Sequence, residues 1–418
     1  MKRIFILIFL IASFTSCEDD SDDVIIICDT PSGLTSTEIT HNSVLLSWSN
    51  LNEIKAVTIE YGLNGFQTGT GTIVTTSDNS ITIEDLVPNM AYEYYISANC
   101  SVDNVSMSSD AKSFNTEVSP VVAQFLPKLS QLNIFTGDLG ELTPSTNTFK
   151  YELSTELYSD YAHKLRLISL PKDEAMVYDG DGLPIFPDGT VMAKTFYYNL
   201  DETNAAAGKK IIETRILIKQ SNIWHLGNYV WNAAQTEATY DEDSHIVPVT
   251  WIDAQGVEKS VDYKVPDYPS CVTCHQNSGR RTPIGPKLRS MNFDVNNTNQ
   301  LQQFINDGHL TNAPNPSSIS ALPDWEDTNF TPEERTRAYF DMNCAHCHSP
   351  GGHHNMNFYE AMDLRLETRF SETNIYDYRY SIMTRIQTSI PGYSMPFLGV
   401  TTPHTEALQL IIPFLESL

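Results

Sequence analysis

Two short stretches, Cys271-Val272-Thr273-Cys274-His275 and Cys344-Ala345-His346-Cys347-His348, share one pattern. In each, two residues separate a pair of cysteines, and a histidine follows the second cysteine directly. The chain has 418 residues, and residues 275–343 lie between the two cysteine pairs. The organisation of the C-terminal third is inferred from this repeated spacing.

The pattern C-x-x-C-H predicts covalent haem attachment, because two thiols at this spacing can each add to a vinyl group of haem. The histidine that follows is then directed at the iron as an axial ligand. We therefore expect two covalently bound haem c groups. The expected attachment residues are Cys271, Cys274, Cys344 and Cys347, with His275 and His348 as axial ligands.

Three other interpretations of the two C-x-x-C-H motifs fit them less well than haem attachment does. Zinc sites also use two C-x-x-C pairs, but usually roughly 15 to 20 residues apart, and a histidine after each pair is not part of that pattern. Thioredoxin-like redox chemistry needs one such pair at the start of a helix and does not explain a duplicated histidine. A disulfide within each pair is the remaining alternative.

The residues around the second motif extend this prediction over 329–418. Thr331-Pro332-Glu333-Glu334 predicts a helix start with a capping box, and a final helix is expected from about Thr402. Between them lies Tyr393-Ser394-Met395-Pro396, so this region resembles class I cytochromes c, in which a Met-Pro loop supplies a thioether ligand. The resemblance implies that His348 is the proximal ligand and Met395 the distal ligand of the second haem.

The first motif lies in a segment, 266–328, expected to form a haem c lobe and a linker rich in Asn, Pro and Ser. His275 is the expected proximal ligand, but no Met-Pro loop precedes the second motif. Met291 and His309 are the principal distal candidates. An open site, or a ligand from further away such as His163, His225 or His245, stays possible. His353 and His354, just after the second motif, are expected to be solvated loop residues.

The N-terminus predicts export. Lys2 and Arg3 precede an apolar run of signal-peptide length, over residues 4–14. Residues 1–16 resemble a bacterial lipoprotein signal, which implies acylation of Cys17 and a membrane lipid anchor. Residues 17–28 include a block of acidic residues, which we expect to be a solvated tether. The expected location is the cell envelope, either periplasmic or at the outer membrane and cell surface.

Seven cysteines are present, and Cys28 and Cys100 remain once the lipidated and motif cysteines are assigned. They bracket the first domain and can form a disulfide in an oxidising compartment. Residues 29–117 show alternating apolar residues, as in Val44, Leu46 and Trp48, with turns between the runs. With Leu86-Val87-Pro88 leading to Tyr92, they resemble a fibronectin type III domain with its tyrosine corner.

Residues 118–265 predict a second β-rich domain, with a strand over Ile212 to Ile218. Glu213-Thr214-Arg215 is interpreted as a polar or turn segment. Continuing into the first motif, this stretch resembles uncharacterised secreted bacterial proteins that end in cytochrome-type motifs. The expected fold class is therefore multidomain: all-β in its fibronectin type III sandwich and β-rich domain, then mainly α in a cytochrome c-like dihaem region.

The composition limits the possible partners. The chain has 52 acidic and 26 basic residues, so nucleic acid and anionic lipid headgroups are excluded as expected partners. The leading functional prediction is an extracytoplasmic electron carrier that meets a redox partner protein, such as a dehydrogenase, an oxidase or a component of a membrane chain. The alternatives are a dihaem peroxidase or oxidase with an open first haem, and a surface protein that binds glycans or proteins.

Overall fold

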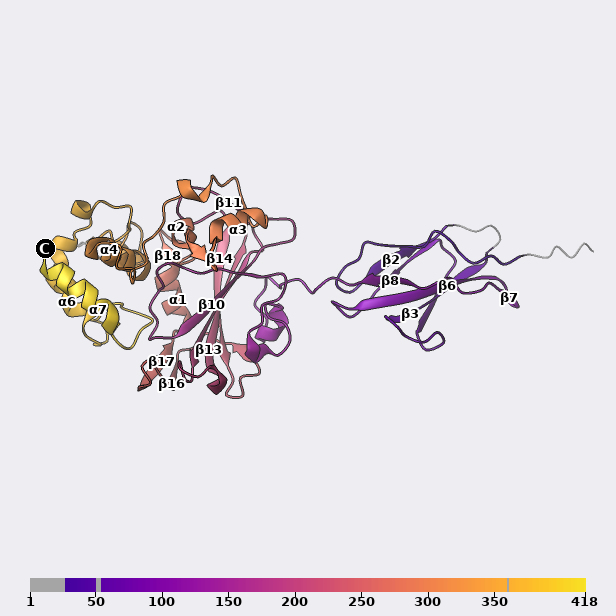
Figure 1. Ribbon diagram of the computed structural model, residues 1–418, viewed down its shortest axis with the longest axis horizontal. Coiled ribbons are helices and arrows are strands. Elements are labelled where there is room, and N and C mark those ends of the chain that lie inside the picture. The colour runs from indigo at the N-terminus through magenta and orange to yellow at the C-terminus, as the bar shows by residue number, and fades with distance from the viewer. Residues whose placement is uncertain (1–26, 50–53, 359–360) are drawn as a thin grey trace, which may run out of the picture. The chain divides into compact units, whose positions relative to one another are not determined.

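The computed structural model describes residues 27–49, 54–358 and 361–418, and these form two compact units (Figure 1). The first unit ends at Ser119, and the second runs from Pro120 to Leu418. The predicted signal peptide, the predicted acylation site at Cys17 and most of the predicted acidic tether lie outside the described residues. Within the described ranges, no helix is long and apolar enough to cross a bilayer.

The first unit is a sandwich of two antiparallel sheets. One sheet has the order β1-β2-β5, and the other has the order β4-β3-β6-β7 with β8 also paired to β6. The strands are β1 (Thr35–Thr37), β2 (Val44–Ser47), β3 (Ala56–Leu63), β4 (Thr72–Thr76), β5 (Ser80–Ile83), β6 (Ala91–Ser101), β7 (Asn104–Val105) and β8 (Lys112–Asn115).

Alternation of apolar residues accounts for the core of this sandwich. Successive side chains of a strand point to opposite faces, and Val44, Leu46, Ile59 and Ile96 are fully buried between the sheets. The hydroxyl of Tyr92 accepts a hydrogen bond from the backbone N–H of Val87 at 2.9 Å. This contact closes the corner that the sequence predicted.

The second unit contains a six-stranded antiparallel sheet in the order β15-β14-β13-β12-β10-β9, with a separate β16–β17 hairpin. Its strands and the short pairs around them are β9 (Phe149–Lys150), β10 (His163–Ser169), β11 (Met176–Val177), β12 (Val191–Asn199), β13 (Lys209–Gln220), β14 (Ile223–Trp231), β15 (Ala238–Tyr240), β16 (His245–Ile252), β17 (Glu258–Val265), β18 (Gln276–Asn277), β19 (Arg280–Arg281), β20 (Asp294–Val295), β21 (Thr298–Asn299) and β22 (Leu310–Thr311).

Short helices joined by loops follow the sheet. They are α1 (Tyr268–His275), α2 (Leu288–Met291), α3 (Gln300–Asn306), α4 (Pro332–Asn343), α5 (His353–Asn357), α6 (Ile375–Ile386) and α7 (Thr405–Glu416). The predicted capping box is confirmed, since the Thr331 side chain accepts from the backbone of Glu334 while the Glu334 carboxylate accepts from the backbone of Thr331.

Both faces of the large sheet are buried. The register aligns Ile168, Met192, Leu217 and Leu226 on one face, where they pack with residues of α2, α3 and α4. The opposite face packs against the chain before β9. A third core holds α4, α6 and α7 together. The sheet and the helices of this unit therefore share apolar cores.

Two sequence interpretations differ from this fold. Glu213-Thr214-Arg215 is not a turn, because it lies in the middle of β13 with Glu213 and Thr214 buried. The linker rich in Asn, Pro and Ser that was expected within 266–328 is folded onto the sheet through Leu301, Phe304 and other buried apolar residues. In both places, polar residues that are paired or buried by tertiary contacts concealed a regular element.

Candidate functional site

The first cysteine pair lies on α1, which begins at Tyr268 after the capping residue Asp267. The Asp267 side chain accepts a hydrogen bond from the Ser270 N–H at 2.9 Å and so caps the helix. The helix contacts β14 of the large sheet. Cys271 packs on the edge of the core between the sheet and α2, α3 and α4. The sheet thereby fixes the position of the motif.

His275, at the end of α1, has one ring nitrogen engaged. Its Nδ1 lies 2.8 Å from the carbonyl oxygen of Thr282. Because a carbonyl only accepts, Nδ1 must carry the proton, which leaves the Nε2 lone pair free. Burial lowers the pKa of His275 to about 3. The ring is therefore neutral near pH 7, as a metal ligand requires.

The second motif follows α4 and contributes to a cavity of about 550 Å³. Cys344, Cys347 and His348 line this cavity, and Met395 lines it from a loop between α6 and α7. The other lining residues come from α1, α4, α5, α6, the chain between α5 and α6, and the loop around Met395. They include Phe340, Leu364, Ile382, Ile386 and Phe397.

His348 is 6% exposed, and burial lowers its pKa to about 3. Its Nδ1 is buried without a hydrogen-bond partner among the described residues. The ring of His354 lies beside it, with 4.3 Å between the ring centroids. His353 and His354 both line the cavity, so the expectation of two solvated loop residues is wrong. Their closeness to the motif in sequence was the one available signal.

The loop that carries Met395 is fastened to the β-rich part of the unit. The carboxylate of Asp160, which is 1% exposed, accepts hydrogen bonds from the backbone N–H groups of Thr401 at 2.8 Å and Thr402 at 3.0 Å. Burial raises the pKa of Asp160, while these hydrogen bonds oppose that rise. A residue far away in sequence thus holds the chain that follows Met395.

The two cysteine motifs meet in space. Cys274 of the first motif lines the same cavity as Cys347 of the second, and the neighbouring Cys347 thiol lowers the pKa of the Cys274 thiol. A further contact from His346 acts in the same direction, whereas burial opposes it. The contact with Cys274, together with burial, raises the pKa of Cys347. The four motif cysteines form no disulfide in the structure.

The segments after the motifs are also joined. The Ser278 N–H donates to the Gly351 carbonyl at 2.8 Å, and Asn277 Nδ2 donates to the Pro350 carbonyl at 3.2 Å. Gly351 has a φ of +81°, and a Cβ there would lie 2.0 Å from Ser278 Oγ. Glycine is therefore required where the two loops touch.

The two distal candidates for the first motif, Met291 and His309, are both packed against other side chains. Met291 is fully buried in the core beneath α3 and does not line the cavity. His309 stacks on Phe149, with ring centroids 4.0 Å apart, and does not line the cavity either. Of the more distant histidines, His163 bonds Glu202 at 2.6 Å and His245 bonds Asp241 at 3.0 Å.

A cluster of three or more Cys, His, Asp or Glu side chains arranged to hold a metal ion does not occur within the described ranges. The motif residues are instead paired thiols, each pair with one adjacent imidazole. This donor set differs from that of a four-ligand zinc site.

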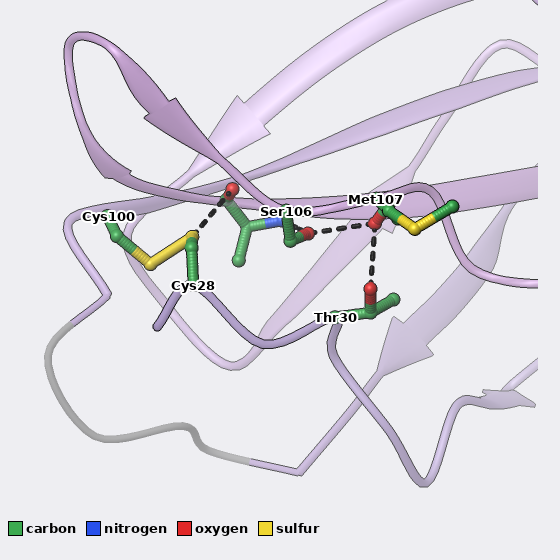
Figure 2. The surroundings of a disulfide bond; sticks show 6 residues. Cys28, Thr30, Cys100, Ser106 and Met107 are labelled. Carbon is green, nitrogen blue, oxygen red and sulfur yellow. Dashed lines mark hydrogen bonds between the residues drawn. A yellow bond between two sulfur atoms is a disulfide. The ribbon is translucent and has the colours of Figure 1, made fainter. Parts of the chain in front are cut away.

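In the first unit, Cys28 and Cys100 form a disulfide with 5.8 Å between their Cα atoms, as the sequence predicted (Figure 2). The N-terminal segment is held further by Thr30, whose hydroxyl donates to the Met107 carbonyl at 2.9 Å. These contacts fasten the start of the sandwich to β6 and the segment after it.

Comparison with known proteins identifies the first unit. The family model of the fibronectin type III domain matches residues 29–112. The fn3 domain of human contactin 1 is 16% identical over 22% of this chain and 79% of that chain, with a TM-score of 0.21. The fn3 domain of the human collagen α-1(XX) chain is 16% identical over 22% of this chain and 88% of that chain, with a TM-score of 0.20. No curated protein sequence matched the chain.

The family match confirms the predicted N-terminal fibronectin type III domain. The protein is multidomain and β-rich, and its helices are few and short among the described residues.

Proposed function

We propose that the second unit is a dihaem c-type cytochrome that transfers electrons in the cell envelope. Cys271 and Cys274 attach one haem, and Cys344 and Cys347 attach the other. His275 and His348 are the proximal ligands, and Met395 is the distal ligand of the second haem. The bound haem supplies reversible one-electron chemistry.

The convergence of the two motifs is the observation that carries this proposal. Cys274 and Cys347 are in contact although 72 residues lie between them in the sequence, over 275–346. A protein that binds two unrelated cofactors has no need of such contact. Attachment sites that touch favour passage of an electron from one cofactor to the next.

The side chains present suit a haem at the second motif. The cavity of about 550 Å³ lies within the range of small-molecule and cofactor sites, about 300–1,000 Å³. Apolar side chains such as Phe340 and Ile382 contribute to its walls, and its neutral imidazole and thioether are the ligand pair of an electron-transfer haem. We accordingly propose a class I cytochrome c-like domain over 329–418.

The first motif supports a second candidate function, that of a peroxidase or oxidase. Met291 is buried in the apolar core that Cys271 borders, and His309 is stacked on Phe149, so each candidate side chain is already engaged in packing. An iron that keeps an open position can bind a small substrate. In that case, the second haem would pass electrons to the first.

The proposed location is the cell envelope, with a lipid anchor on Cys17. The Cys28–Cys100 disulfide is consistent with an oxidising compartment. The net charge of −26 favours a redox partner with a basic docking surface.

Expression of the full chain in a host that matures c-type cytochromes tests the proposal. We expect mass spectrometry to find two haems per chain and redox titration to show reversible change at both. The variants Cys271→Ala/Cys274→Ala and Cys344→Ala/Cys347→Ala should each lose one haem. A matured chain without added mass or a haem absorption band rules out the proposal. Peroxide turnover with a high-spin first haem favours the enzyme.

A further inference from the structure

A row of polar side chains crosses the large sheet beside the first motif. The register places Arg166 of β10 opposite Lys194 of β12, Lys194 opposite Arg215 of β13, and Arg215 opposite Asn228 of β14. Directly opposed residues point to the same face of a sheet. With neighbouring strands about 4.8 Å apart, the row extends roughly 14 Å.

The row lies on the face that carries the first motif. The next row on this face, which includes Ile168 and Leu226, packs in the core that Cys271 borders. The helix α1 contacts β14 at one end of the row. Lys194 and Arg215 are both close enough to His275 to act on it electrostatically. The row therefore begins at the motif and runs away from it across the sheet.

Several hydrogen-bond donors of this row have no partner among the described residues. They are Nε and Nη2 of Arg166, Nε of Arg215 and Nδ2 of Asn228. Arg166 is 2% exposed and Asn228 is 4% exposed, so water does not reach them freely. Buried donors without partners are costly and rare in folded proteins. Their number in one row indicates a site for a group that accepts hydrogen bonds.

The charges around the row point to an anion. Arg166 pairs with Glu156 at 2.9 Å, and Arg215 pairs with Glu213 at 2.5 Å. Within the described part of the chain, no carboxylate lies within ion-pair distance of Lys194. Lys164 shares Glu156 with Arg166 at 3.6 Å, and Glu152 lies 3.9 Å from Arg166. Four basic side chains thus face three carboxylates, of which Glu152 and Glu156 are partly exposed.

We propose that Arg166, Lys194, Arg215 and Asn228 form a carboxylate-binding site, and that its occupant is a propionate group of the haem attached to Cys271 and Cys274. This inference rests on the proposed function. Guanidinium groups bind carboxylates through two parallel hydrogen bonds, which matches the free donors of Arg166. The propionates of haem lie on the edge away from its vinyl groups, and the row likewise leads away from α1. A free carboxylate has the same chemistry and is the competing occupant.

The first test is the pH dependence of the midpoint potential in the matured full chain. Arg166→Gln and Arg215→Gln are compared with Arg280→Gln, which removes an exposed cation on β19 near the same motif. A propionate freed from its cation regains a pKa in the accessible range. In Arg166→Gln and Arg215→Gln, the midpoint potential of one haem should then fall as pH rises. The slope of this potential against pH should approach the value for one proton taken up per electron. Wild type and Arg280→Gln should lack this slope, and loss of charge alone does not create it.

The second test separates the two sources of the carboxylate. Acetate binding is measured by calorimetry on the matured chain and on Cys271→Ala/Cys274→Ala, which cannot attach the first haem. If a propionate fills the site, acetate binds the double variant and not the matured chain. Acetate binding to the matured chain, weakened at least tenfold by Arg215→Gln, overturns the propionate and assigns a free carboxylate.

Failure of the proposal is distinguishable from failure of the proposed function. Haem counting by mass spectrometry decides the function independently, and a chain without haem is still titrated with acetate. If no chain binds acetate and the variants keep the potential and pH profile of the wild type, the carboxylate site is overturned. If Arg166→Gln does not fold, Arg215→Gln provides the comparison, because it also removes a cation of the row.

Discussion

At the scale of single residues, Met395 tests the second haem site most directly. It lines the same cavity as His348, and histidine–methionine ligation raises the potential of a haem. We expect Met395→Ala to lower the midpoint potential of one haem and to change its absorption spectrum. Potentiometric titration with optical detection measures both.

Met356→Ala is the matched control, because Met356 is 66% exposed on α5 and lies outside the lining of the cavity. It should leave both potentials unchanged. If Met395→Ala behaves like this control, Met395 is not a ligand.

Because His404 is buried as a neutral ring, we expect it to make the protein less stable in acid. Its ring stacks on Tyr158 at 4.1 Å, its Nδ1 lies 3.1 Å from the Tyr339 hydroxyl, and burial lowers its pKa to about 4. In the unfolded chain a histidine has a pKa of about 6.5. The stability from the neutral ring is full above pH 6.5, and it decreases as pH falls toward 4 because the unfolded chain takes up the proton first.

One such group contributes a slope of up to about 1.4 kcal/mol per pH unit to the free energy of unfolding. His275 and His348 shift in the same direction, so the wild type is compared with His404→Gln. The free energy of unfolding is measured with denaturant between pH 4.5 and 7 and plotted against pH. The slope of this plot should be smaller in the variant by up to about 1.4 kcal/mol per pH unit, which corresponds to one proton. An identical slope in the two proteins contradicts the assignment.

At the scale of elements, Asp160 joins the strand region to the loop of Met395. Its carboxylate accepts from two successive backbone N–H groups, at Thr401 and Thr402. We expect Asp160→Asn to lower the free energy of unfolding by roughly 1–3 kcal/mol, since it removes buried charge-assisted hydrogen bonds. It should also convert part of the matured protein to a form without the thioether ligand.

The control for this variant is Asp294→Asn, in the exposed position that begins β20. It should alter neither stability nor spectrum. A spectrum of Asp160→Asn that matches the wild type, with lower stability alone, limits Asp160 to a structural role.

The Cys28–Cys100 disulfide should contribute to the stability of the first unit. It joins residues 72 apart in the sequence, and a cross-link of such a loop stabilises by typically 2–4 kcal/mol through the unfolded state. Cys28→Ser/Cys100→Ser should lower the stability of the fibronectin type III domain by about this amount. Fluorescence of Trp48, in its core, follows the unfolding. A variant as stable as the wild type would contradict this prediction.

At the scale of the whole molecule, every proposed haem ligand lies in the unit that begins at Pro120. Residues 120–418, exported behind a separate signal, should therefore attach two haems with the potentials of the full chain. Mass spectrometry and redox titration of the fragment measure this. A fragment that folds but carries one haem or none shows that the first unit contributes to the site.

The sequence predicted much of each local element. Alternation at Val44, Leu46 and Trp48 predicted a buried strand and its turns, and Thr331 to Glu334 predicted the start of α4. The interpretation of Glu213 and Arg215 as a turn was wrong, because polar residues inside a strand look like a break until their partners on neighbouring strands are known. His353 and His354 were misjudged because the cavity that they line is formed by residues far apart in the sequence.

The sequence by itself determined the two C-x-x-C-H motifs and the fibronectin type III domain, because each depends on spacing or alternation within a short stretch. It also determined the disulfide pair, because Cys28 and Cys100 remained once the other cysteines were assigned. Only the tertiary structure decided that Cys274 touches Cys347, that Asp160 holds the loop after Met395, and that three cations and an asparagine align beside α1. These contacts join residues far apart in the chain. They depend on strand register and on how the helices pack on the sheet, which no local pattern of residues records.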